Sequence, residues 1–184
     1  MKKFLKWTLI VVASLVVLLV IAFSYLNYQN RKKSPPGTAT YDKNGTKITV
    51  EYSRPSKRGR VIFGELVPFG KVWRTGANEA TTFETNKDLM IGGKALPAGK
   101  YTLWSIPEKD KWTVIWNGKQ YSWGVKGPFD PSASREPEAD VLQIQVAPQE
   151  SNDVVEQFTI SFDEANGLAL VIAWDKTKVA VPLQ

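Results

Sequence analysis

Residues 46–52 read TKITVEY, and the alternation of apolar and polar side chains in this stretch decides the fold class. An extended chain turns successive side chains to opposite sides, so a strand with one buried face needs this period of two. The same period returns in residues 142–146 and 158–162, which predicts further strands of the same kind. In the first stretch the apolar set is Ile48, Val50 and Tyr52, and the polar set is Lys47, Thr49 and Glu51.

Turn residues separate the predicted strands. Asn-Gly pairs stand at residues 44–45, 117–118 and 166–167, and such pairs tolerate the positive φ of tight hairpin turns. Residues 100–106 and 111–116 are predicted to pair as a hairpin, because a Pro-Glu-Lys-Asp stretch lies between them.

The C-terminal part of the chain is predicted to hold two more strands. Residues 168–174 are apolar on both faces, which is typical of a central strand, and residues 178–183 follow them across a short turn. We count about nine to ten short strands and no convincing helical period after the N-terminus. The sequence therefore predicts an all-β fold, either an antiparallel β-sandwich or a barrel-like domain.

The N-terminus carries one long apolar segment. Residues 7–26 read WTLIVVASLVVLLVIAFSYL, twenty residues without a charge, which as a helix would span the roughly 30 Å hydrocarbon core of a lipid bilayer. Basic residues flank the run on both sides, and aromatic residues lie near its ends. We expect a membrane anchor over residues 1–29, a linker over residues 30–37 and the all-β domain over residues 38–184.

A cleaved secretory signal peptide is the alternative for this segment, with Ala22-Phe23-Ser24 as a small-x-small cleavage site. We favour the anchor because the apolar run is longer than the usual length of about 7–15 residues. A short basic stretch followed at once by an apolar run is how export signals begin, so we expect the short N-terminus in the cytoplasm and the rest of the protein outside. The predicted location is the cytoplasmic (inner) membrane, with a single pass and an extracytoplasmic or periplasmic domain.

The net charge of +6 belongs to the flanks of the apolar segment. Residues 1–33 carry six of the 24 Lys and Arg side chains and no Asp or Glu, so the remaining 18 basic side chains equal the 18 acidic ones. A formally neutral domain gives no reason to expect a nucleic-acid partner.

The chain contains no Cys and no His. Disulfides, thiol catalysis, a Ser-His-Asp triad and the usual zinc sites are thereby excluded. The spacings of a calcium loop and of a phosphate-binding loop are also missing, so we expect neither a metal nor a cofactor.

Residues 72–85 read VWRTGANEATTFET and form the most suggestive loop of the chain. Gly76 permits a backbone that other residues resist, Asn78 can close a turn, and Arg74 offers a planar fork to a carboxylate. These roles suit a purely structural loop, and the same side chains also suit an anionic or sugar-like ligand. The predicted ligand-binding residues are Trp73, Arg74, Asn78 and Glu79, with Trp104 and Trp123 as aromatic walls.

A carboxylate-dependent hydrolase acting on envelope or imported polysaccharide is the alternative function. Glu79 and Glu84 bracket a predicted strand beginning at Ala80, and two carboxylates about 5–9 Å apart can hydrolyse a glycosidic bond. Loop carboxylates are more often structural, however. We therefore expect a domain that binds a glycan or an envelope protein without catalysis.

Three segments resemble one bacterial family: RGRVIFGELVPFGKVWRTGANEATTFET at residues 58–85, IGGKALPAGKYTLWSIP at residues 91–107 and WDKTKVAVPL at residues 174–183. The family is the domain-of-unknown-function family numbered 2911, and the resemblance runs from about Thr38 to the C-terminus. It implies an envelope-associated all-β domain of Bacteroidetes-type bacteria and supplies no activity, cofactor or catalytic residue. Family members often carry a cleaved signal, from which the long apolar run here departs.

Overall fold

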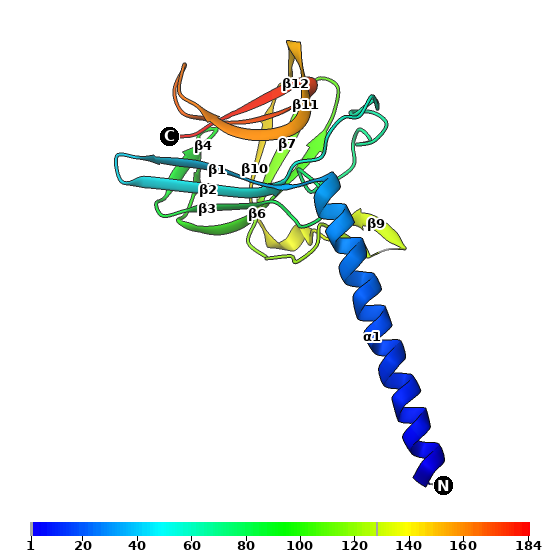
Figure 1. The fold of residues 1–184 in the computed structure, drawn as a ribbon. Coiled ribbons are helices and arrows are strands. Elements are labelled where there is room, and N and C mark those ends of the chain that lie inside the picture. Colours follow the sequence, from blue (N-terminus) through cyan, green and yellow to red (C-terminus); the bar gives the residue numbers. More distant parts are fainter. Residues whose placement is uncertain (1, 128) are drawn as a thin grey trace. The chain divides into compact units, whose positions relative to one another are not determined.

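The computed structural model describes residues 2–127 and 129–184. The chain divides into two units, residues 1–33 and residues 34–184. The first unit is the helix α1 (Lys2–Lys33), and the second, which we call the β domain, contains all the strands (Figure 1).

Helix α1 forms because Leu, Val, Ile and Ala fill it and neither Pro nor Gly interrupts it. The helix carries no charged side chain over residues 7–26, and its described side chains are exposed along almost the whole length. The last turn holds Arg31, Lys32 and Lys33, where cations stabilise the negative end of the helix dipole. The helix is therefore long and apolar enough to serve as a membrane anchor or a signal sequence.

The helix runs further than the sequence pattern predicts. It includes residues 30–33, and the first strand begins at Pro36, so the expected linker over residues 30–37 is reduced to Ser34 and Pro35. Proline disfavours the helical conformation of the residue before it, which explains why the helix stops ahead of Ser34.

The described residues of the β domain form twelve strands and one short 3-10 helix, η1 (Pro137–Ala139). Six strands make one antiparallel sheet in the order β1-β2-β3-β6-β7-β10, and the others pair as β4-β5, β8-β9 and β11-β12. The all-β prediction is confirmed. The strands are β1 (Pro36–Lys43), β2 (Thr46–Ser53), β3 (Thr82–Thr85), β4 (Leu89–Ile91), β5 (Lys94–Leu96), β6 (Gly99–Pro107), β7 (Trp112–Asn117), β8 (Val125–Gly127), β9 (Asp130–Ala133), β10 (Asp140–Val146), β11 (Gln149–Asp163) and β12 (Ala169–Pro182).

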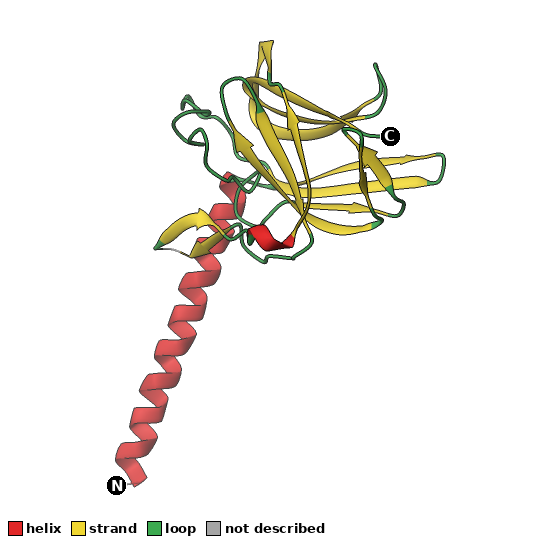
Figure 2. Ribbon diagram, turned by 180° about the vertical axis from the view of Figure 1, so that it is seen from behind, coloured by secondary structure: helices red, strands yellow, loops and turns green. Residues whose placement is uncertain are grey.

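Two layers enclose the core of the β domain. The six-stranded sheet is one layer, and the long β11-β12 ribbon lies across it as the other (Figures 1 and 2). The strands do not close into a barrel, because among the described residues the edge strands β1 and β10 do not pair with each other. Apolar side chains from both layers fill the space between them, including Ile48 and Val50 of β2, Val114 and Trp116 of β7, Phe158 and Ile160 of β11, and Ile172 and Trp174 of β12.

The stretch at residues 46–52 lies in β2, as its alternation predicts. Ile48 and Val50 are fully buried in the core, whereas Lys47 and Glu51 are exposed. The hairpin to β1 turns at Asn44 and Gly45, whose φ angles of 53° and 72° are those that an Asn-Gly turn accepts. The predicted hairpin of β6 and β7 is also present.

Two predictions about the chain between strands are wrong. Asn117 is the last residue of β7, but no hairpin follows; its side chain is fully buried, and the Gly118 N–H donates to Ala139 O at 2.8 Å. At the C-terminus β12 is one strand where two were predicted. Asp175 takes a φ of 54° there, and the pairing with β11 continues past it with an irregular register, as it does at a β-bulge.

Candidate binding site at Arg74

The loop at residues 72–81 is fixed against β6 by its backbone. The Trp73 N–H donates to Ser105 O at 2.7 Å, and the Ser105 N–H donates to Trp73 O at 2.9 Å. Thr75 then adopts a φ of 51°, which is unusual for a β-branched residue. Its hydroxyl lies 2.9 Å from Ser105 Oγ, and its carbonyl accepts a hydrogen bond of 2.8 Å from Thr81 Oγ1. These contacts hold a strained backbone, a feature that clusters at functional sites.

The next residues of the loop pack closely on β2. A Cβ on Gly76 would lie 3.0 Å from Ser53 O and 3.1 Å from Thr81 Oγ1, so only glycine fits this position without a shift. Asn78 has a φ of 55°, which asparagine tolerates better than most residues. Its side-chain amide donates to Ser34 O at 3.3 Å, so it ties the start of the β domain to the loop.

Arg74 is the one side chain of this loop whose charge the described residues leave unsatisfied. Its Nε is buried and has no hydrogen-bond partner among them. Burial lowers the pKa of the Arg74 guanidinium, and no neighbouring carboxylate acts to raise that pKa. The residue as a whole is partly exposed. A cation in such a place favours an anionic partner from outside the chain.

The segment around Trp123 completes the surroundings of Arg74. Gly124 packs directly on the aliphatic part of the Arg74 side chain, and the Gly124 N–H donates to Asn78 O at 3.1 Å. Trp123 is a partly exposed residue, and its carbonyl accepts a hydrogen bond of 2.9 Å from Ser134 Oγ. Two predicted binding residues, Arg74 and Asn78, therefore meet at Gly124, which follows the predicted residue Trp123 in the chain. We call Arg74, Asn78, Trp123 and Gly124 the Arg74 site.

Glu79 follows Asn78 in the chain and is hydrogen-bonded to β2. Its Oε2 accepts a hydrogen bond of 3.4 Å from Ser53 Oγ. Glu84 does not bracket a strand with it, because Glu84 lies inside β3 on the exposed side, 3.7 Å from Lys100 Nζ. The two carboxylates thus have different surroundings.

Trp73 is partly buried and packs against the main core. It stacks on Trp174 with ring centroids 6.1 Å apart and a 16° angle between the planes, and it meets Phe158 edge to face at 5.1 Å. Its indole N–H donates to Gly76 O at 3.0 Å, which anchors the loop from below. Trp73 therefore supports the Arg74 site from the core side.

Trp104 belongs to a second, smaller cluster with Ala80 and Ile115. It is fully buried, and the ring of Tyr121 covers it edge to face at 5.4 Å. The structure does not bring Trp104 to the surface of the Arg74 site. Because successive side chains of β6 face opposite sides, Leu103 joins the main core and Trp104 packs beneath the loop instead.

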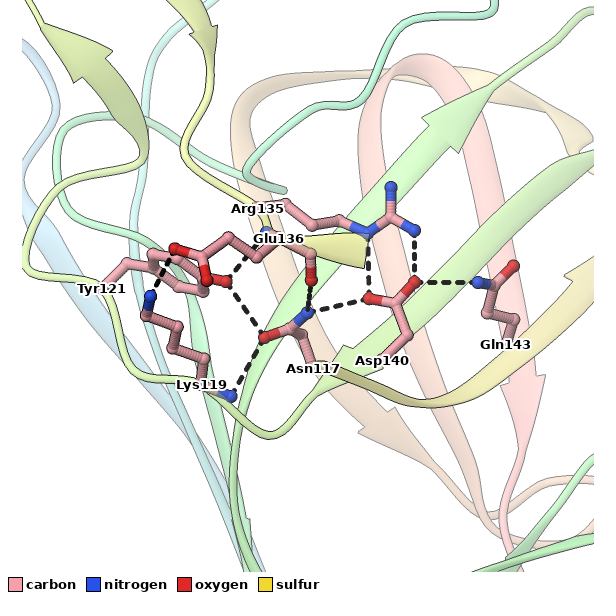
Figure 3. Close-up of polar contacts among 7 residues, drawn as sticks. All are labelled: Asn117, Lys119, Tyr121, Arg135, Glu136, Asp140 and Gln143. Carbon is pink, nitrogen blue, oxygen red and sulfur yellow. Dashed lines mark hydrogen bonds and ion pairs between the residues drawn. The ribbon is translucent and has the colours of Figure 1, made fainter. Parts of the chain in front are cut away.

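A polar network fixes the segment that carries Trp123 and Gly124, and Figure 3 shows its side chains. Asn117 is at its centre: its Nδ2 donates to Asp140 Oδ1 and to Glu136 O, both at 2.8 Å, and its Oδ1 accepts from Tyr121 Oη at 3.2 Å. Lys119 forms an ion pair with Glu136 at the exposed edge of the network. Since Tyr121 also packs on Trp104, the network links the end of β7 to the smaller cluster of Ala80, Trp104 and Ile115.

Arg135 and Asp140 form the largely buried ion pair of this network. The Arg135 Nε donates to Asp140 Oδ1 at 2.9 Å, Nη2 donates to Oδ2, and the two side chains are only 11% and 7% exposed. Burial acts to raise the pKa of Asp140, but the hydrogen bonds from Arg135 and Asn117 outweigh it, and the pKa lies below its ordinary value. Gln143 donates to Oδ2 at 2.8 Å. This carboxylate is fully hydrogen-bonded, so its role is structural.

Sequence reasoning missed two residues that shape the Arg74 site. Gly124 and Ser105 come from distant segments, and a lone glycine or serine carries no pattern that points to a loop elsewhere in the chain. As for metals, the described part of the chain holds no group of three or more acidic side chains that could bind an ion.

Comparison with known proteins gives one family. No curated protein and no solved structure matches the chain. A family model described as "Protein of unknown function (DUF2911)" matches residues 34–183, which is nearly the whole β domain. Because the match covers well over half of the 184 residues, the chain belongs to the DUF2911 family.

Proposed function

We propose that the protein is a single-pass, membrane-anchored envelope protein whose β domain binds an anionic group of a ligand or partner at the Arg74 site, without catalysis. The observation that carries the proposal is the buried Nε of Arg74, which has no hydrogen-bond partner among the described residues. Burying a cation costs solvation free energy, and a bound carboxylate or phosphate would offset that cost with bidentate hydrogen bonds.

The surroundings of Arg74 support a preformed site. Thr75 is held by Ser105 and Thr81, and Gly124 fixes the aliphatic part of the Arg74 side chain. A site whose residues are already in place loses less conformational entropy on binding. The exposed apolar helix α1 is long enough to cross a membrane, which fits a tethered binding domain.

The hydrolase alternative gains no specific support from the geometry. Glu79 is hydrogen-bonded to Ser53, and Glu84 lies on the surface of β3 beside Lys100. A pair of catalytic carboxylates would have to face one cleft.

The test is a thermal-unfolding titration of the full-length protein in detergent micelles, with inorganic phosphate and succinate as probes at constant ionic strength. A ligand that binds only the folded state raises its stability by an amount set by the ligand concentration and the dissociation constant. The key variant is Arg74→Met, which removes the charge and keeps an apolar side chain against Gly124. Lys71→Ala, an exposed cation nearby, is the matched control.

We expect at least one anion to stabilise the wild type and Lys71→Ala, and to have no effect on Arg74→Met. Without anion, Arg74→Met should be as stable as the wild type or more stable, because an unpaired buried charge is gone. A large loss of stability in Arg74→Met without any anion would show that Arg74 is structural. Equal stabilisation of all three proteins would show that the anion acts elsewhere.

A further inference from the structure

A cleft lies at one end of the β domain, and neither Arg74 nor the other residues of the Arg74 site line it. Its volume is about 320 Å³, at the lower end of the range of small-molecule sites. Four segments meet there: the loop at residues 63–69, the turn between β6 and β7, the turn between β10 and β11, and residues 176–177 of β12.

The floor of the cleft is aromatic and rigid. It consists of Phe63, Phe69 and Trp112. The Phe63 ring meets Trp112 with centroids 4.8 Å apart, and it also contacts Trp73 and Trp174. These rings belong to the packed core or lie against it, so Phe63 cannot turn away without disturbing its neighbours.

Phe69 is held by its own loop. A Cβ on Gly64 would lie 2.9 Å from Phe69 Cε2, so the ring sits directly on a glycine whose φ is +98°. The Gly64 N–H donates to Val67 O at 2.9 Å, and the Gly70 N–H donates to Pro107 O at 2.9 Å. The loop is thus closed on itself and tied to the end of β6, which fixes the direction of the Phe69 ring.

The rim of the cleft carries groups that donate and accept hydrogen bonds. It holds two carboxylates, Glu108 and Glu150, and two ammonium groups, Lys109 and Lys176, so its formal charge is zero. A site without net charge does not select an ion, and charged rim groups would lose hydration against a purely apolar ligand.

The irregularity of β12 contributes to this rim. Lys176 and Thr177 are consecutive, and in a regular strand their side chains would face opposite sides, yet both line the cleft. The left-handed φ of 54° at Asp175 lies immediately before them, where the register with β11 is irregular. Asp175 is held in place by an ion pair of 2.5 Å with Lys57. Bulges that re-aim side chains in this way are common beside functional sites.

From these features we infer that the cleft binds a short neutral carbohydrate. The apolar face of a sugar ring would pack on Phe63 and Phe69, and its hydroxyls, which both donate and accept, would meet the carboxylates and ammonium groups of the rim. Proline-rich peptides also use aromatic-lined grooves, but they offer few hydrogen-bonding side chains to a rim of this kind. A carbohydrate therefore uses both halves of the cleft.

The experiment is calorimetric titration of the full-length protein with maltotetraose, cellotetraose, xylotetraose and chitotetraose as separate probes. The protein is kept in lauryldimethylamine oxide micelles, because maltoside detergents would themselves present sugar. Phe69→Ala removes one of the three aromatic side chains that line the floor of the cleft. Glu150→Gln removes one charge of the rim at an exposed position. Phe129→Ala is the matched control, since Phe129 is an aromatic residue that is 99% exposed and does not line the cleft.

We expect one of the probes to bind saturably, with affinity at least about tenfold weaker in Phe69→Ala and unchanged in Phe129→Ala. Glu150→Gln, which cannot disturb the core, should also weaken binding. Three results would overturn the inference: no probe binds, the bound probe is insensitive to both cleft variants, or a proline-rich decapeptide binds in competition at the cleft while no sugar does.

Discussion

Gly124 packs on the side chain of Arg74 so closely that a Cβ at position 124 would lie 2.1 Å from Arg74 Cδ and 2.7 Å from its Cβ. The position of the guanidinium thus depends on a residue that carries no charge and no side chain.

Gly124→Ala should therefore displace Arg74 and lower the free energy of unfolding by about 1–3 kcal/mol, the usual cost of overpacking. It should also abolish the anion effect proposed for the wild type. Urea unfolding and the anion titration measure the two effects. Gly118→Ala is the control, because a Cβ there would meet Val141 Cγ2 at an ordinary 3.4 Å. If Gly124→Ala is as stable as the control and still responds to anion, the packing does not position Arg74.

Ser105→Ala tests the support of the strained loop. The Ser105 and Thr75 hydroxyls are both fully buried and 2.9 Å apart, so the substitution leaves the Thr75 hydroxyl with only a weak contact. We expect a loss of about 1–3 kcal/mol in the free energy of unfolding, against almost none for the exposed control Ser122→Ala.

The double variant Ser105→Ala/Thr75→Val sharpens this test. It removes both hydroxyls, so its cost should be less than the sum of the two single variants. Strictly additive costs would mean that the two hydroxyls do not interact in solution.

Asp140 makes the stability depend on pH. Its pKa is lower in the folded protein than the unfolded value of about 3.9. The folded state therefore gains stability from the carboxylate above pH 4, and it loses that stability as the pH falls through the lower folded value. Urea unfolding measured from about pH 6 down to about pH 2 should show this loss.

Asp140→Asn isolates the contribution of the carboxylate. It leaves the largely buried Arg135 without its counter-ion, so we expect about 3–5 kcal/mol of destabilisation at neutral pH and a weaker dependence on acid. The exposed control Asp110→Asn should behave as the wild type does. A neutral-pH stability of Asp140→Asn equal to that of the wild type would contradict a structural ion pair.

Local pattern predicts the parts of this fold that depend on neighbours in sequence. The alternation in β2 and the turn at Asn44-Gly45 are local signals, and both are confirmed. Strands such as β4 and β8 have three residues each, too few to show a period, which explains why twelve strands were counted as nine or ten. The continuity of β12 depends on its pairing with β11, which no local rule contains.

The candidate site is predictable only in part, for the same reason. The loop sequence indicates Arg74 and Asn78, because their chemistry is unusual in so short a stretch. It does not indicate that Trp73 packs on Trp174 or that Trp104 is covered by Tyr121, since both depend on segments brought together by the sheet. A sequence shows the chemistry of each side chain. The whole fold determines whether that side chain is buried in the core or exposed to a ligand.

Helix α1 decides whether the protein stays in the membrane. If it anchors the protein, the mature chain keeps residues 7–26 and stays with the membrane fraction after alkaline extraction. Val16→Arg/Leu19→Arg should release it, because each Arg near the centre of a spanning helix costs about 2.5–3.5 kcal/mol of insertion free energy. Val154→Arg places the same side chain at an exposed apolar position of the β domain and should leave the protein in the membrane. Intact-mass measurement identifies the first residue of the mature chain. A mature protein that begins near Tyr25 and appears in the soluble fraction would show that α1 is a cleaved signal peptide, and that the β domain works without a tether.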